Sequence, residues 1–213
     1  MADVLRVEGA DAAAYLQGQL SQDIDGIAVG AEAWSFVLEP NGHIDALVHV
    51  ARTGDDAFAL TVDGGLGEIV ETRLRKFLLR TKATITCEAG SADDDAARIG
   101  DGRPGAPEFD DRAVPAESGW VDRAVSFTKG CYTGQELVAR MDSRVAEPPR
   151  RLVRLAADAV LTPGAPIEVD GAEVGHVTSA VGGRALGYVK RGARSVGEAS
   201  VGGTPAHMER VGA

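Results

Sequence analysis

Alternation of apolar and polar residues along the first 88 positions predicts a series of short β-strands, because strand side chains alternate between the two faces of a sheet. Runs of this kind lie at 4–7, 34–38, 44–50, 57–62 and 83–87. Between the second and third runs, the segment Glu39-Pro40-Asn41-Gly42 carries strong turn chemistry. This segment predicts a β-hairpin.

Two stretches follow helical spacing instead. Asp11 is a suitable N-cap for a helix that begins at Ala12. The polar end of this helix, at 17–23, contains Gly18, which costs about 1 kcal/mol of helix propensity and is explained either by a backbone or ligand contact or by fraying. Asp63 can cap the second helix. That helix carries an apolar stripe at spacings of three and four, formed by Leu66, Ile69, Val70, Leu74, Phe77 and Leu78.

The order of these elements, β-α-β-β-β-α-β, predicts an α+β fold in which an antiparallel sheet carries helices on one face. Residues 91–117 are rich in Asp, Glu, Gly and Pro, so we expect a polar, solvated connector there. From 151 onward, short strands and glycine turns predict a small antiparallel β-barrel. We therefore expect a body at 1–150, with 91–117 as its acidic connector, and a C-terminal β-barrel at 151–213.

The composition narrows the range of partners. The chain of 213 residues has 22 Lys and Arg against 32 Asp and Glu, and this net charge of -10 argues against a nonspecific grip on nucleic acid. No apolar run approaches the ~18 residues of a membrane-spanning helix, and the N-terminus lacks the pattern of a signal peptide. We expect a cytoplasmic protein that binds neither nucleic acid nor membrane. Cys87 and Cys131 are then free thiols, and we expect no metal site.

The stretch from Ser126 to Glu136 holds the most suggestive chemistry. Cys131 stands two residues after Lys129, and if this stretch is extended, both side chains point to the same side. A lysine ammonium within a few ångströms would stabilise a thiolate at Cys131. Gln135 and Glu136 together offer donors and acceptors that could bind a fused heterocycle with adjacent amide and amine edges.

The same residues have plainer explanations. Free cysteine is among the most buried residue types, so a packing role for Cys131 weighs as much as a reactive or ligand-binding one. Tyr132 is more often a half-buried packing residue than a stacking platform. After the motif, the chain has its most basic part, with arginines at 140, 144, 150, 151 and 154. These arginines form either a solvated face or a local positive patch that suits an anionic ligand.

The octapeptide Lys129-Gly130-Cys131-Tyr132-Thr133-Gly134-Gln135-Glu136 resembles the signature of the YgfZ family of folate-binding proteins, relatives of the glycine-cleavage T-protein, an aminomethyltransferase. The resemblance extends to 7–12 with 15–23, to 38–44, and to 177–179 with 185–189. It implies a tetrahydrofolate-binding α+β body, a small C-terminal barrel and a role in making or maintaining iron–sulfur clusters, with effects on enzymes such as those that modify tRNA. The implied partners are folate and iron–sulfur proteins or their assembly machinery.

The resemblance also implies which residues act. Cys131 would be functionally required, and Glu136 occupies the place where the T-protein relatives carry an acid that recognises the pterin. Arg140 and Arg151 would contact the glutamyl tail or line the pocket. The candidate set is therefore Cys131 and Lys129 as catalytic residues, with Glu136, Gln135, Tyr132, Arg140 and Arg151 as contacts of tetrahydrofolate or a one-carbon-substituted folate.

Two departures from the family pattern leave other functions open. The region between Cys87 and the motif is an acidic loop where the family would have a fuller second half of the folate domain. The catalytic aspartate of the aminomethyltransferase lies outside the octapeptide, and Asp45 is a poor candidate for it. The alternatives are a folate-dependent aminomethyl or one-carbon transferase and a folate-binding adaptor without chemistry.

Overall fold

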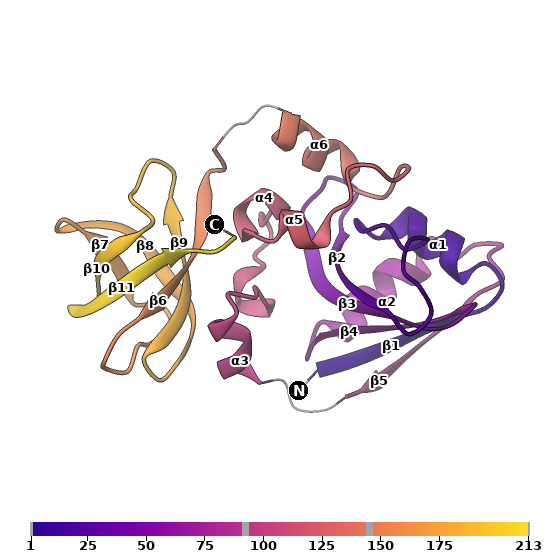
Figure 1. Ribbon diagram of the computed structural model, residues 1–213, viewed down its shortest axis with the longest axis horizontal. Helices are drawn as coiled ribbons and strands as arrows, with labels where there is room; N and C mark the ends of the chain where they lie inside the picture. Colours follow the sequence, from indigo (N-terminus) through magenta and orange to yellow (C-terminus); the bar gives the residue numbers. More distant parts are fainter. Residues whose placement is uncertain (1, 91–93, 144–146, 213) are drawn as a thin grey trace. The chain divides into compact units, whose positions relative to one another are not determined.

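The computed structural model describes residues 2–90, 94–143 and 147–212 (Figure 1). Contacts divide the chain into two compact units: an N-terminal unit of 1–93 and 121–140, and a barrel unit of 94–120 and 141–213. The described part of the expected acidic connector therefore folds with the barrel. The octapeptide folds with the N-terminal sheet.

The described residues of the N-terminal unit form a five-stranded antiparallel sheet in the order β2-β3-β4-β1-β5. Its strands are β1 (Ala2–Glu8), β2 (Glu32–Leu38), β3 (Ile44–Gly54), β4 (Ala57–Asp63) and β5 (Thr84–Ala89). Each predicted run falls on one of these strands, and β2 and β3 form the predicted hairpin. The α+β fold expected from the sequence is confirmed.

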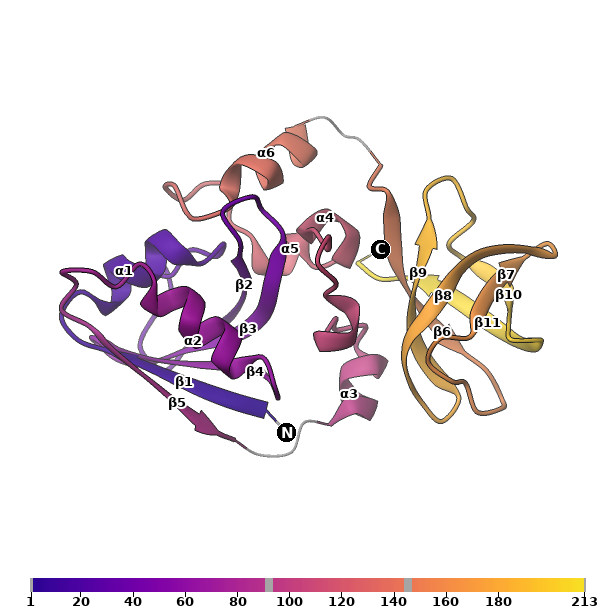
Figure 2. The same cartoon turned by 180° about the vertical axis from the view of Figure 1, so that it is seen from behind.

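Helices α1 (Ala12–Gln19) and α2 (Gly67–Arg75) pack into one apolar core with the sheet. Leu16 of α1 and Leu74 of α2 are fully buried there, together with Leu5 of β1. The hydroxyl of Tyr15 donates a hydrogen bond to the backbone carbonyl of Leu74 and so links the two helices. Figure 2 shows them side by side from behind. Both helices therefore cover the same face of the sheet.

The helix starts are stabilised differently from the prediction. Asp11 occupies the N-cap position of α1, but its side chain makes no capping hydrogen bond. At the start of α2, Asp63 contributes its backbone carbonyl, and Oδ2 of Asp3 accepts hydrogen bonds from the amides of Gly65 and Gly67 at 3.0 Å each. A carboxylate on β1 thus accepts hydrogen bonds from backbone amides at the start of a helix about sixty residues later in the chain.

The apolar stripe of α2 is also shorter than predicted. Val70 and Leu74 are buried, whereas Ile69 is 47% and Phe77 is 40% exposed. The helix ends at Arg75, so Phe77 no longer follows the helical spacing that placed it in the stripe. The periodicity therefore located the helix correctly but extended its buried face too far.

The described strands of the barrel unit close into an antiparallel barrel in the order β10-β11-β6-β9-β8-β7, with β10 pairing back to β7. They are β6 (Arg150–Ala156), β7 (Pro166–Val169), β8 (Ala172–Val181), β9 (Arg184–Lys190), β10 (Gly197–Val201) and β11 (Thr204–Arg210). Val153, Ile167 and Met208 lie fully buried in its core. The predicted C-terminal barrel is confirmed, and it includes β10 and β11, which the sequence pattern did not resolve.

The described part of the expected connector is helical instead of a solvated loop. It contains α3 (Asp95–Gly100), η1 (Ala106–Glu108) and α4 (Pro115–Ser118), while 91–93 lie outside the described residues. The buried Glu108 carboxylate accepts hydrogen bonds from Arg98, from the Gly105 amide and from the hydroxyls of Thr178 and Ser179. Since a buried charge must be paired and hydrogen-bonded, this network holds the segment on the barrel.

Candidate functional site

The central motif lies in the N-terminal unit between α5 (Val121–Ala124) and α6 (Gln135–Ser143). Residues 125–134 form bends and turns, not the extended strand considered above. Ser21, just beyond α1, holds the start of this segment. Its Oγ donates to the Ala124 carbonyl at 2.6 Å, and its carbonyl accepts from the Ser126 amide at 2.9 Å.

Lys129 anchors the segment to the end of α1. Its Nζ donates to the backbone carbonyls of Gln17, Leu20 and Gln22 at 2.6, 2.7 and 2.8 Å. Each proton of the ammonium thus has an acceptor. Burial lowers the pKa of Lys129 to about 8, and nearby aspartates act in the opposite direction. At neutral pH the side chain is therefore mainly the ammonium that these carbonyls bind.

Two glycines allow the motif and the β2–β3 hairpin to approach closely. Gly134 has φ +82°, and a Cβ there would lie 2.6 Å from the carbonyl oxygen of Glu39. Gly42, in the hairpin turn, has φ +91°, and a Cβ there would lie 2.5 Å from Cβ of Leu137. Any larger residue at either position would both adopt a disfavoured backbone conformation and clash.

Gly18 of α1 contacts the motif through its backbone. Its carbonyl accepts a hydrogen bond from the Thr133 amide at 3.0 Å, and the Thr133 hydroxyl lies 3.3 Å from Oε1 of Gln19. A Cβ on Gly18 would meet no atom within 4 Å. The backbone contact is therefore present, but packing does not require a glycine at this position.

These anchors leave two candidate groups facing solvent. Cys131 is a free, exposed thiol, which excludes the buried packing role. The side chain of Glu136 is 86% exposed, and its carboxylate pairs with Arg140 one turn further along α6. The motif therefore presents a thiol and a carboxylate from a loop and a helix start that are fixed to α1 and to the hairpin.

Tyr132 and Gln135 serve the local structure. Tyr132 is only 8% exposed, and its ring centre lies 5.1 Å from Nζ of Lys129. Its amide donates to Oε1 of Gln135 at 3.3 Å, and the Gln135 amide donates to the Tyr132 carbonyl at 3.3 Å. This reciprocal pair connects the loop to the start of α6. Contact of either residue with a folate stays a prediction.

Residues 150–212 match the family model of the CAF17 C-terminal β-barrel domain. An uncharacterized protein of Haemophilus influenzae is 25% identical over 67% of this chain and 67% of its own. A chloroplastic protein of Arabidopsis thaliana, described as a candidate transferase, is 38% identical over 51% of this chain and 26% of its own. The chain thus spans about a quarter of the Arabidopsis protein.

The glycine cleavage system aminomethyltransferase T from Bartonella henselae shares the fold of this chain. Its crystal structure gives a TM-score of 0.69 at 15% sequence identity, covering 100% of this chain and 83% of that chain. The protein therefore has an aminomethyltransferase-like fold that ends in a CAF17-type barrel.

The predicted basic region is largely neutralised. The described arginines pair with carboxylates as follows: Arg140 with Glu136, Arg150 with Asp110 and Glu117, Arg151 with Glu147, and Arg154 with Glu209. Arg144 lies outside the described residues. A positive patch, one of the two interpretations given above, is not formed by these residues because the acidic chain supplies each with a carboxylate partner. Arg151, on β6 of the CAF17-type barrel, keeps one buried nitrogen, Nη1, without a hydrogen-bond partner in the described residues.

Sequence reasoning missed the buried residues that hold the motif segment against β2 and the end of α1. Ser21 and Ser35 are fully buried, and Oγ of Ser21 accepts from the Phe36 amide at 2.8 Å while it donates to the Ala124 carbonyl. Gln17 holds the turn after α1, because its Oε1 accepts from the Ile24 amide at 2.7 Å. In the sequence, the polar run at 17–23 was the one feature that pointed to these supporting residues.

The second thiol is less accessible than Cys131. Cys87 lies on the edge strand β5 and packs partly against the core, and burial together with nearby acids raises its pKa. Within the described ranges, no group of three or more His, Cys, Asp and Glu side chains is arranged to hold a metal ion. In the same ranges, no helix has both the length and the apolar character needed to cross a membrane.

Proposed function

We propose that this protein acts in the cytoplasm and binds tetrahydrofolate or a one-carbon-substituted folate. We further propose that its Cys131 thiol acts in the assembly or maintenance of iron–sulfur clusters. The observation that carries the proposal is the exposed Cys131 on a loop that is fixed at both ends. Support comes from the aminomethyltransferase-like fold and from the CAF17-type barrel. The YgfZ-like octapeptide connects these two features with folate and with iron–sulfur proteins.

The exposed carboxylate fits one part of a folate. Glu136 presents two acceptor oxygens that match the adjacent ring N–H and amino group of a pterin. Its present partner, Arg140, is half exposed and lies on the same helix, so their ion pair contributes only about 0.3–0.5 kcal/mol. A ligand can therefore displace Arg140 at little cost. Tyr132, being buried, does not offer a free stacking surface in this arrangement.

The hydrogen bonds of Lys129 support a positioning role for this residue. Its ammonium group donates hydrogen bonds to three backbone carbonyls at the end of α1. Lys129 therefore fixes the backbone two residues before the thiol. Direct stabilisation of a thiolate by Lys129 stays a prediction. A one-carbon-substituted folate would supply the one-carbon unit when bound. The contribution proposed for this chain is to bind the pterin of the folate and to hold a thiol in place.

A single thiol does not hold a cluster, because clusters commonly take about four thiolate ligands. We therefore propose that Cys131 acts on an iron–sulfur protein or on its assembly machinery, with the remaining ligands supplied by that partner. An exposed thiol on a rigid loop suits such an encounter, since it needs no local unfolding to be reached.

The second candidate function is folate-dependent transfer of an aminomethyl or one-carbon unit. The fold of aminomethyltransferase T and the candidate transferase from Arabidopsis favour it. The acid considered outside the motif is already paired: Asp45 is 10% exposed and accepts a hydrogen bond from Nε of Arg73 at 2.6 Å. A transferase would therefore need to release this ion pair before Asp45 could meet a substrate.

Two substitutions test the proposal, each with a matched control. Cys131→Ser is expected to keep folate affinity but to lose rescue of iron–sulfur enzymes in a deletion strain, whereas Cys87→Ser removes the other thiol and should rescue fully. Glu136→Ala should weaken folate binding in calorimetry. Asp142→Asn, which removes an exposed carboxylate from the same helix, should leave folate binding unchanged.

The outcomes separate the hypotheses. Full rescue by Cys131→Ser would refute the role of the thiol, and an unchanged affinity of Glu136→Ala would refute the pterin contact. Turnover of methylene-tetrahydrofolate that depends on an added amine would favour the transferase. If the wild-type protein showed no measurable folate binding, both proposed functions would be refuted.

A further inference from the structure

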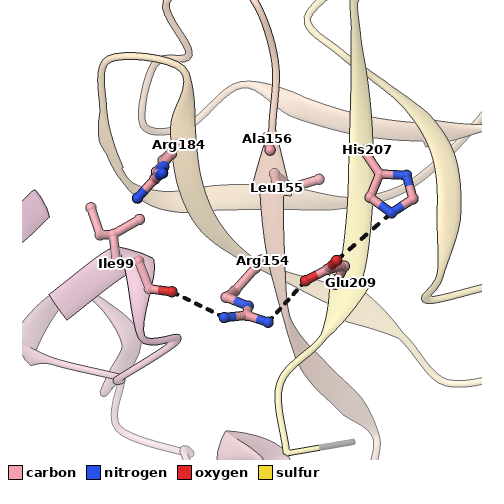
Figure 3. A pocket seen from close by; sticks show the side chains of 8 residues that line it. Ile99, Arg154, Leu155, Ala156, Arg184, His207 and Glu209 are labelled. Atoms are coloured by element: carbon pink, nitrogen blue, oxygen red, sulfur yellow. Dashed lines mark hydrogen bonds and ion pairs between the residues drawn. The ribbon is translucent and has the colours of Figure 1, made fainter. Parts of the chain in front are cut away.

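A pocket of about 250 Å³ lies on the outer surface of the barrel unit, beside the end of α3 (Figure 3). Its lining comes from α3 and from strands β6, β9 and β11. The pocket lies entirely within the barrel unit and contains no residue of the octapeptide. It is therefore a separate feature from the site described above.

The strand register builds the pocket around a small residue. Ala156 of β6 lies opposite Arg184 of β9 on one side and opposite His207 of β11 on the other. Residues directly opposite each other in neighbouring strands have Cβ atoms about 5 Å apart. The methyl group of Ala156 thus leaves a depression with a guanidinium on one flank and an imidazole on the other, as Figure 3 shows.

Most charges around the depression are already paired. Arg154 donates to the Gly100 carbonyl at 3.0 Å and to Glu209 at 2.8 Å. His207 lies 3.5 Å from Glu198 and 3.9 Å from Glu209. Glu209 therefore has a cationic partner in Arg154, and both carboxylates lie beside the imidazole of His207.

Arg184 is the exception. Among the residues that the structure describes, its side chain has no hydrogen bond or ion pair, although its backbone pairs within the sheet. Its Nη1 lies 3.3 Å from the position that a Cβ on Gly100 would occupy, so the glycine leaves room for the guanidinium at the end of α3. The pocket thus contains an uncompensated positive charge in a protein with a net charge of -10.

We propose that this pocket binds the phosphate or carboxylate group of a small molecule, with Arg184 as the main contact and His207 and Arg154 at its sides. A guanidinium matches both groups because it can donate two parallel hydrogen bonds to their oxygens. The volume limits the ligand: sites for drug-sized molecules occupy about 300–1,000 Å³. The pocket therefore accepts a small anion or the end group of a larger molecule.

Titration of the isotope-labelled full chain with inorganic phosphate, and separately with acetate, tests this proposal by two-dimensional NMR. Saturable shifts are expected for the amides of Ala156, Arg184 and His207. Arg184→Gln should weaken binding roughly tenfold or more, because it removes a charge-assisted contact. Ala156→Val should weaken binding as well by filling the depression, at a strand position where valine is favoured.

Arg210→Gln provides the matched control, since Arg210 is an exposed arginine on β11 outside the pocket. It should change the affinity less than about twofold, because an exposed charge outside the pocket is screened by solvent and salt. Stronger binding of phosphate or of acetate decides which group the pocket prefers. The absence of saturable shifts up to about 10 mM of both anions, tenfold above a millimolar dissociation constant, would overturn the proposal. An equal loss in Arg184→Gln and Arg210→Gln would do so too.

Discussion

Replacing Gly134 by alanine should detach the motif from the β2–β3 hairpin, whereas the same change at Gly130 should be harmless. Gly134 has φ +82°, and a left-handed conformation costs a non-glycine residue about 1–2 kcal/mol. The new Cβ would also lie 2.6 Å from the Glu39 carbonyl oxygen and 2.8 Å from Cβ of Leu38. Overpacking of this kind costs about 1–3 kcal/mol. The two contributions together predict a loss of about 2–5 kcal/mol for Gly134→Ala.

Gly130 is the internal control, four residues away in the same motif. Its φ lies outside the left-handed region, and a Cβ there would meet no atom within 4 Å. Alanine at a compatible glycine stabilises by about 0.4–1 kcal/mol, because it restricts the unfolded chain. The two substitutions add the same methyl group and should change the free energy of unfolding in opposite directions.

Denaturant unfolding of the full chain measures both free energies, and hydrogen exchange gives the local readout. The Thr133 amide, bonded to the Gly18 carbonyl at 3.0 Å, should lose protection in Gly134→Ala and keep it in Gly130→Ala. Equal stabilities of the two variants, within the ~0.5 kcal/mol typical of neutral surface changes, would show that the hairpin does not hold the motif. The geometric account of the site would then be wrong.

Three further predictions follow from buried groups. Lys129→Met leaves three carbonyls of the α1 end without their donor, and denaturant unfolding should show a loss of about 2–4 kcal/mol. The chain's three tyrosines, Tyr15, Tyr132 and Tyr188, all have pKa values raised by burial, to about 12 for the first two. The contribution of these raised pKa values to stability is complete below pH ~10 and is lost as the pH rises towards 12. Phenolate absorbance should therefore appear together with alkaline unfolding. Titration of the phenols near pH ~10 in the folded protein would contradict this. Glu108→Ala leaves the buried Arg98 without that carboxylate and should cost about 3–5 kcal/mol, measured by denaturant unfolding.

Period-two alternation was sufficient to locate the strands, because it follows from the geometry of a single strand with one buried face. It identified β1 to β5 and the barrel region without any knowledge of the neighbours. Helix ends were harder to predict. The start of α2 depends on Asp3, a residue on another element, and its apolar stripe stops where the helix stops, at Arg75.

The acidic connector shows why composition alone did not predict structure between 94 and 117. Glu108 and Glu117 count as charged residues in the sequence, yet both are buried and paired with arginines in the barrel unit. A carboxylate in solvent and a carboxylate in a buried ion pair contribute identically to net charge. Only the partners distinguish them, and Arg150 lies 33 residues from Glu117 in the chain.

The motif shows the same limit at the site itself. The sequence identified Cys131 as the thiol with unusual neighbours, and the structure shows that it is exposed. Proximity in sequence predicts that Lys129 acts on Cys131, and this stays a prediction. Nothing in the sequence indicated that the ammonium also binds three carbonyls more than 100 residues away. A charge that stabilises a thiolate at Cys131 could come from this ammonium, from the start of α6 or from a bound partner. Comparison of folded Lys129→Met with the wild-type protein separates these cases. A loss of stability with an unchanged rate of Cys131 alkylation at neutral pH assigns Lys129 to positioning. A lower alkylation rate after removal of the ammonium charge assigns it to activation of the thiol.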